Sequence, residues 1–133
     1  MAFLKVLGGG VVSQPGQWGA SSYFFSFDGV NIVVDCGIRL NSRESILPDL
    51  DWLKNKRVDA LLITHAHSDH MGAAPLLADQ HPEAKIYTTF ETTEISRILL
   101  YNNLKTSERL ELPLNYTRQQ CSKFFDRILI AEF

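Results

Sequence analysis

Three short apolar runs constrain the fold of this chain more than any other feature. Residues 30–34, 58–64 and 84–88 each have the length and composition of a β-strand. In residues 30–34 nearly every side chain is apolar, so we expect this strand to be buried on both faces, with 58–64 and 84–88 as further core strands. Residues 2–7 and 22–27 read as two more strands, and the dipeptide Asp28-Gly29 predicts a tight hairpin between 22–27 and 30–34.

Apolar residues at helical spacing separate these strands. The predicted helices are a short one carrying Ile46, Leu50 and Leu53 with Pro48 in its first turn, a second over about 72–80 that Pro82 closes, and a third that starts with capping-box spacing at Thr88 and Glu91 and runs to about Asn102. Strands that alternate with helices predict an α/β layered domain, opened here by an antiparallel hairpin.

Bulk composition narrows the class of protein. The chain has 133 residues, 45% of them hydrophobic, which fits one compact domain and leaves no room for a second. A formal net charge of −2 gives no chain-wide basic field of the kind that nucleic-acid binding favours. Cys36 and Cys121 lie far apart without CxxC spacing, so we expect reduced thiols. The N-terminal apolar stretch is too short and glycine-rich for a membrane span or an export signal, which favours the cytoplasm.

The C-terminal stretch FFDRILIAEF is unusually apolar for a chain end. It shows no cap, turn or polar ending, whereas chain termini are usually well solvated. This pattern predicts a chain that is cut inside a larger domain. An exposed apolar end of this kind also favours self-association.

Three of the four histidines gather in the stretch ITHAHSDHMG, directly after the predicted strand 58–64. His65 and His67 are two residues apart, so in an extended segment both imidazoles point the same way and can bind one ion. Asp69 and His70 follow at the turn into the next helix, where they can face a second ion. Neutral imidazole and carboxylate oxygen suit zinc, with manganese or iron as alternatives.

The stretch THAHSDHMG resembles the HxHxDH motif of the metallo-β-lactamase fold superfamily. The resemblance implies that His65 and His67 bind one divalent metal ion and that Asp69 and His70 bind another. It also implies that Asp69 helps to orient or deprotonate the attacking water. VNIVVDCG resembles the superfamily strand that ends in an aspartate, which gives Asp35 a supporting role, holding a ligand histidine or the loop backbone by hydrogen bonds. The implied fold is the N-terminal half of an αββα sandwich, with a mixed sheet and flanking helices.

The order of motifs over about residues 3–103 resembles the β-CASP group of RNA-processing nucleases, which includes RNase J and the cleavage-and-polyadenylation endonuclease. The resemblance implies an RNA substrate. Members of the family complete the site with another histidine, a bridging aspartate and a final histidine downstream. We expect none of these in His81, Asp79 or Asp126, because His81 ends a helix that we expect at the surface. This chain is therefore expected to supply half of a binuclear site and to be inactive alone.

Two other functions remain open at the level of sequence. Thioester, lactam or small-ester hydrolases of the glyoxalase II type use the same HxHxDH motif. Alternatively, the chain is a catalytically inactive fragment that acts as an interaction module through its apolar end.

Overall fold

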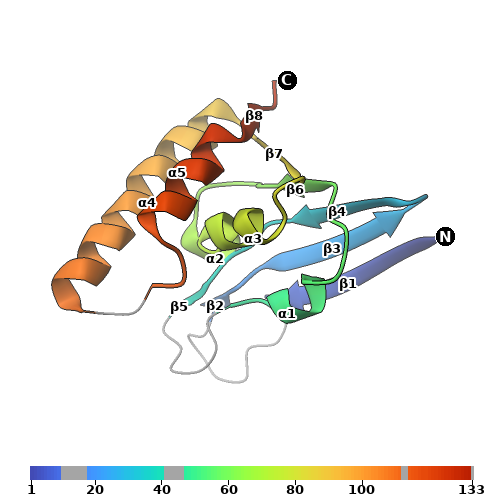
Figure 1. Cartoon of the computed structure of the whole chain (residues 1–133), viewed down its shortest axis with the longest axis horizontal. Helices are drawn as coiled ribbons and strands as arrows, with labels where there is room; N and C mark the ends of the chain where they lie inside the picture. The colour runs from blue at the N-terminus through green and yellow to red at the C-terminus, as the bar shows by residue number, and fades with distance from the viewer. Residues whose placement is uncertain (10–17, 41–46, 112–113, 133) are drawn as a thin grey trace.

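A six-stranded mixed sheet forms the centre of the protein in a computed structural model, which describes residues 1–9, 18–40, 47–111 and 114–132 (Figure 1). The strand order is β1-β3-β4-β6-β7-β8, with β1, β3 and β4 antiparallel and β4, β6, β7 and β8 parallel. The strands are β1 (Ala2–Gly8), β3 (Ser22–Phe27), β4 (Val30–Val34), β6 (Ala60–Leu62), β7 (Lys85–Thr88) and β8 (Ile128–Ile130). The short strands β2 (Trp18–Gly19) and β5 (Arg39–Leu40) pair separately. The α/β fold predicted from the sequence is confirmed.

The predicted hairpin joins β3 to β4. Asp28 and Gly29 both have positive φ, at 47° and 81°. This is the backbone conformation of the two-residue turns whose twist matches that of the flanking strands. The turn sets the register, in which Phe27 lies opposite Val30 and Tyr23 opposite Val34.

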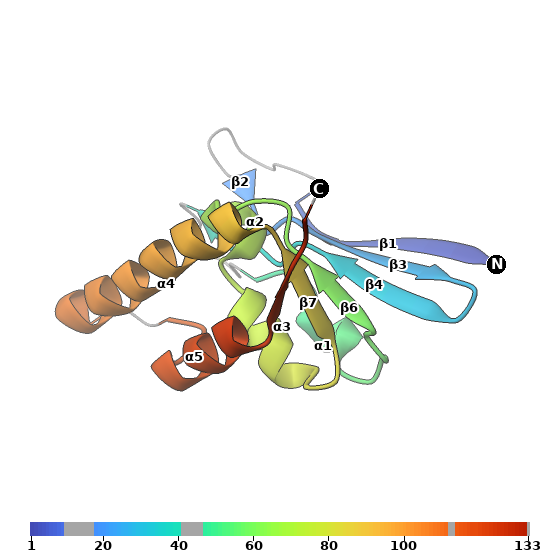
Figure 2. The same ribbon diagram turned by 90° about the horizontal axis from the view of Figure 1, so that it is seen from above.

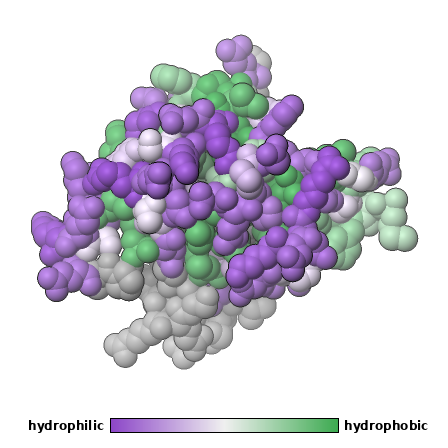
Figure 3. Space-filling model, viewed as in Figure 1, coloured by the Kyte–Doolittle hydropathy of each residue, from purple (hydrophilic) through white to green (hydrophobic). Residues whose placement is uncertain are grey.

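The helices that cover the sheet lie on one side of it. They are α1 (Leu50–Leu53), α3 (Ala74–Gln80) and α5 (Arg118–Asp126), while α4 (Phe90–Leu110) packs against α5 and extends beyond the sheet (Figures 1 and 2). The core lies between the sheet and these helices, and it includes Phe24, Val33, Leu61 and Ile86 from the strands and Leu77 and Phe124 from the helices. Seen from this side, the surface of the molecule is mostly hydrophilic (Figure 3). None of the described helices is long and apolar enough to span a membrane.

The opposite face of the sheet is apolar and exposed, and we call it the open sheet face. It carries large side chains from four strands that are each between 41% and 63% exposed: Leu4, Val6, Phe25, Phe27, Val30 and Leu129. The prediction that strand 30–34 is buried on both faces was therefore wrong. The apolar composition of β4 suits burial on both faces, but Val33 is the one residue of this strand that is fully buried.

Three helix predictions need correction. Pro48 precedes α1, whose N-cap is Asp49; Ile46 lies outside the described residues. The predicted helix over 72–80 begins later, at Ala74, as α3, and a separate short helix that was not predicted, α2 (Ser68–Met71), precedes it. The predicted capping box at Thr88 is wrong, because the hydroxyl of Thr88 donates to the carbonyl of Ile63 while Thr89 caps α4.

The prediction that the third helix ends at about Asn102 was also wrong. Helix α4 continues to Leu110, since polar residues with good helix propensity extend it beyond the apolar stripe. Within the described residues, the apolar tail forms the end of α5, which starts with a capping box of Thr117 and Gln120, and strand β8, which pairs in parallel with β7. Arg127, between these elements, donates hydrogen bonds to the carbonyls of Ala78, His81 and Ala84.

Candidate metal centre

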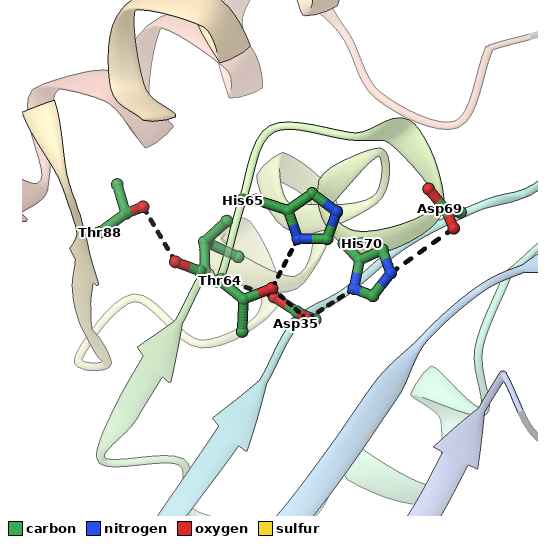
Figure 4. A network of polar contacts seen from close by, with 7 residues as sticks. Asp35, Thr64, His65, Asp69, His70 and Thr88 are labelled. Carbon is green, nitrogen blue, oxygen red and sulfur yellow. Dashed lines mark hydrogen bonds and ion pairs between the residues drawn. The ribbon is translucent and has the colours of Figure 1, made fainter. Parts of the chain in front are cut away.

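The segment 65–70, which we call the histidine loop, lies at the carboxyl ends of β4 and β6, where open α/β sheets commonly bind ligands (Figure 4). Asp35 follows β4 directly, and Thr64 and His65 follow β6 closely. His67 is the N-cap residue of α2, and Asp69 and His70 lie within that helix. The structure thus brings together the residues that the sequence singled out.

Backbone hydrogen bonds tie the histidine loop to the segment after β4. The amide of Cys36 donates to the carbonyl of His70 at 2.7 Å, and that of Ile38 donates to Ser68 at 2.9 Å. In return, the amide of Ala73 donates to the carbonyl of Cys36 at 2.8 Å. The two segments are so close that a Cβ atom on Gly37 would lie 1.7 Å from the carbonyl oxygen of Asp69.

Asp35 anchors the site through both carboxylate oxygens. Its Oδ1 accepts from the backbone N–H of Thr64, and its Oδ2 accepts from the Thr64 hydroxyl, both at 2.8 Å. His70 Nδ1 lies 2.8 Å from the same Oδ2. Asp35 is only 2% exposed and has φ of 59°, a left-handed conformation that aspartate tolerates better than most residues. These contacts are the ones that its predicted supporting role requires, although metal binding itself remains a prediction.

The four candidate ligands form two pairs, and each pair has donor atoms that suit one divalent ion. His70 Nε2 lies 3.5 Å from Asp69 Oδ2, and two metal bonds of about 2.1 Å at a tetrahedral angle would span roughly 3.4 Å. The ring centroids of His65 and His67 are 4.8 Å apart, and those of His65 and His70 are 4.1 Å apart. Within the described ranges no group of three or more histidine, cysteine, aspartate or glutamate side chains is placed to hold an ion together.

The surroundings of His65 favour its neutral form. Partial burial lowers the pKa of its imidazole, and the nearby rings of His70 and His67 lower it further, although Asp35 and Asp69 oppose this shift. A neutral imidazole is the form that binds metal.

His81, Asp79 and Asp126, which were not expected to bind metal, do lie outside the histidine loop. His81 follows α3, at the far end of that helix from the histidine loop. The expectation that its helix end is at the surface was wrong, because its side chain is packed and the residue is only 7% exposed. Asp79 accepts from Gln120 Nε2 at 2.9 Å, and Asp126 lies in α5.

Both cysteines are free, as expected from their spacing, and both are also buried. Burial is the main cause that raises the pKa of Cys36, and the neighbouring carboxylate of Asp35 adds to it, so the thiol stays protonated. Thr64 was not among the predicted site residues, although its position directly before His65 was a usable signal.

The profile of the metallo-beta-lactamase superfamily matches residues 15–114. The chain belongs to this superfamily. Two solved structures share its fold: a superfamily protein from Sulfolobus tokodaii, with TM-score 0.53 at 19% identity over 96% of this chain and 48% of that one, and a diphosphatase of the PhnP family, with TM-score 0.54 at 20% identity over 78% and 48%.

Curated relatives of this metallo-beta-lactamase superfamily chain are named as RNA-processing proteins. It is 32% identical over 117 residues to cleavage and polyadenylation specificity factor subunit 3-I of Arabidopsis thaliana, covering 86% of this chain and 17% of that protein. The probable RNase MJ4 of Methanocaldococcus jannaschii is 32% identical over 130 residues, with coverages of 85% and 30%. The chain thus spans less than a third of these relatives. The predicted superfamily is confirmed, and so is the predicted similarity to RNA-processing nucleases.

Proposed function

We propose that this chain carries part of the metal centre of a nuclease that hydrolyses RNA phosphodiester bonds. The observation that carries the proposal is the histidine loop, which the buried carboxylate of Asp35 holds at the carboxyl ends of β4 and β6. Relatives of the chain that are named as ribonucleases and cleavage factors support RNA as the substrate. They give no matching support to thioester, lactam or small-ester hydrolysis.

Each loop residue has a distinct task in this proposal. His65 and His67 would hold one ion, and Asp69 and His70 a second, with zinc favoured over manganese or iron by the imidazole-rich donor set. When bound, divalent ions activate water and neutralise charge on the phosphoryl group. The partly exposed carboxylate of Asp69 would also orient the attacking water or relay its proton. Asp35 would keep the ring of His70 oriented through Nδ1.

Replacing His67 with alanine is expected to remove the zinc ion that it would hold with His65, and RNA cleavage with it. The side chain of His67 is exposed beside His65, so its loss removes a ligand without emptying the core. Zinc per chain by elemental analysis and cleavage of a labelled RNA by the protein carrying this chain measure the two effects.

His81→Gln is the matched control for this experiment, because it changes the one histidine that lies away from the loop. The control should retain metal and cleavage. The proposal fails if the His67→Ala protein keeps stoichiometric zinc and full cleavage, or if the wild-type protein binds zinc but leaves RNA intact.

We also propose that the chain by itself self-associates, through the open sheet face rather than the tail alone. Its exposed apolar side chains would gain about 25 cal/mol for each Å² removed from water. Gel filtration of the 133-residue chain should show oligomers, and Phe27→Lys, which charges a side chain that is 63% exposed, should shift the chain towards monomer. A wild-type monomer over a wide concentration range would contradict this proposal.

A further inference from the structure

We propose that the Thr64 hydroxyl is a positioning group, which connects Asp35 to His65 and decides which ring nitrogen of His65 carries the proton. The proposal rests on the metal site proposed above, since it concerns the nitrogen that His65 would offer to an ion. Its basis is a chain of short contacts, Asp35 Oδ2 to Thr64 Oγ1 at 2.8 Å and Thr64 Oγ1 to His65 Nδ1 at 2.9 Å (Figure 4).

The direction of these hydrogen bonds follows from counting protons. A hydroxyl group has one proton to donate, and an ionised carboxylate can only accept. Thr64 Oγ1 therefore gives its proton to Asp35 Oδ2. Towards His65 the same oxygen can only accept, so Nδ1 of His65 must carry a proton and donate it. In the neutral ring, Nε2 is then left with a free lone pair.

His70 reaches the same state without an intermediary. Its Nδ1 lies 2.8 Å from Asp35 Oδ2, and the carboxylate requires a proton on that nitrogen. One buried carboxylate thereby sets the tautomer of two candidate ligands, His70 directly and His65 through Thr64. Both rings then present Nε2 as the atom available to a metal ion.

The hydroxyl of Thr64 can be removed without disturbing the anchor of the loop. The Thr64 backbone N–H bonds to the other carboxylate oxygen, Asp35 Oδ1, and this bond does not depend on the side chain. Thr64 is exposed, so a substitution there leaves no buried cavity. Thr64→Val keeps the shape and loses the hydroxyl, whereas Thr64→Ser keeps the hydroxyl.

The test is the ¹⁵N NMR spectrum of the histidine rings in the metal-free protein, at a pH where the imidazoles are neutral. Wild type and Thr64→Ser should show His65 protonated at Nδ1. Thr64→Val should shift His65 towards the Nε2-protonated form, while His70 keeps its proton on Nδ1. Zinc affinity should fall about 10-fold in Thr64→Val, the lower end of what the loss of such supporting contacts costs, and should recover in Thr64→Ser.

Thr88→Val is the control, because it removes a neighbouring threonine hydroxyl that bonds to the carbonyl of Ile63 and has no contact with Asp35 in the network drawn (Figure 4). It should leave the His65 tautomer unchanged. A wild-type His65 protonated at Nε2, or a tautomer that does not respond to Thr64→Val, would overturn the proposal. The NMR readout needs neither metal nor RNA, so a protein with the expected tautomer but no nuclease activity would count against the proposed function alone.

Discussion

Gly37→Ala is expected to abolish zinc binding and to destabilise the fold by about 3 kcal/mol or more, at the upper end of the usual cost of overpacking. The added Cβ atom would lie 1.7 Å from the Asp69 carbonyl oxygen and 2.7 Å from the His70 backbone nitrogen. These are backbone atoms, so no side-chain rotation can relieve the clash. The histidine loop must move away from the segment after β4, and the candidate ligands move with it.

Urea unfolding and zinc content of the purified variant measure these two effects. Gly29→Ala is the matched control, since its Cβ would meet nothing within 4 Å. It should cost only about 1 kcal/mol for a left-handed alanine and leave zinc binding intact. If Gly37→Ala behaved like Gly29→Ala, the close approach of the two segments would be wrong.

Asp35→Ala is expected to weaken zinc binding about 10- to 100-fold, the range for partners that orient metal ligands. It leaves three partly buried donors without their acceptor: the Thr64 amide, the Thr64 hydroxyl and His70 Nδ1. A fully buried group left unpaired costs about 1–3 kcal/mol and a partly buried one costs less, so the free energy of unfolding should fall by a smaller amount. Zinc titration and urea unfolding give both quantities.

Asp59→Ala provides the comparison for Asp35. Asp59 also accepts a hydrogen bond from a backbone N–H, that of Asn31 at 2.8 Å, and pairs with Arg57. It differs from Asp35 in position, because it directly precedes strand β6. It therefore lies at the opposite end of that strand from the histidines. Its replacement should leave zinc affinity unchanged. Equal losses of zinc affinity in the two variants would show that Asp35 acts through general stability rather than by holding the loop.

Much of the fold could be predicted because its local signals agree with one another. The Asp28-Gly29 turn fixed the β3–β4 hairpin, and the apolar runs located β6 and β7. The histidine spacing identified a loop whose side chains do converge. In each case the signal lies within a few residues of the structure that it predicts.

Features that depend on distant contacts could not be predicted in the same way. The apolar composition of β3 and β4 shows that these strands suit burial. It does not show whether another element covers Phe27 and Val30 on the open sheet face. Strand β8 gains its place only by pairing with β7, far away in sequence. The role of Thr64 depends on Asp35, which directly follows the neighbouring strand β4 and is close to Thr64 in space but not in sequence.

The backbone bonds between the histidine loop and the segment after β4 have a consequence for motion. Opening the loop breaks the bonds that Cys36 and Ile38 donate to His70 and Ser68, so the two segments should open as one cooperative unit. Amide hydrogen exchange at Cys36 and Ile38 would then report the state of the loop, even though neither residue is a candidate ligand. Bound metal should slow exchange at both positions, because an ion that binds only the closed form lowers the population of the open one.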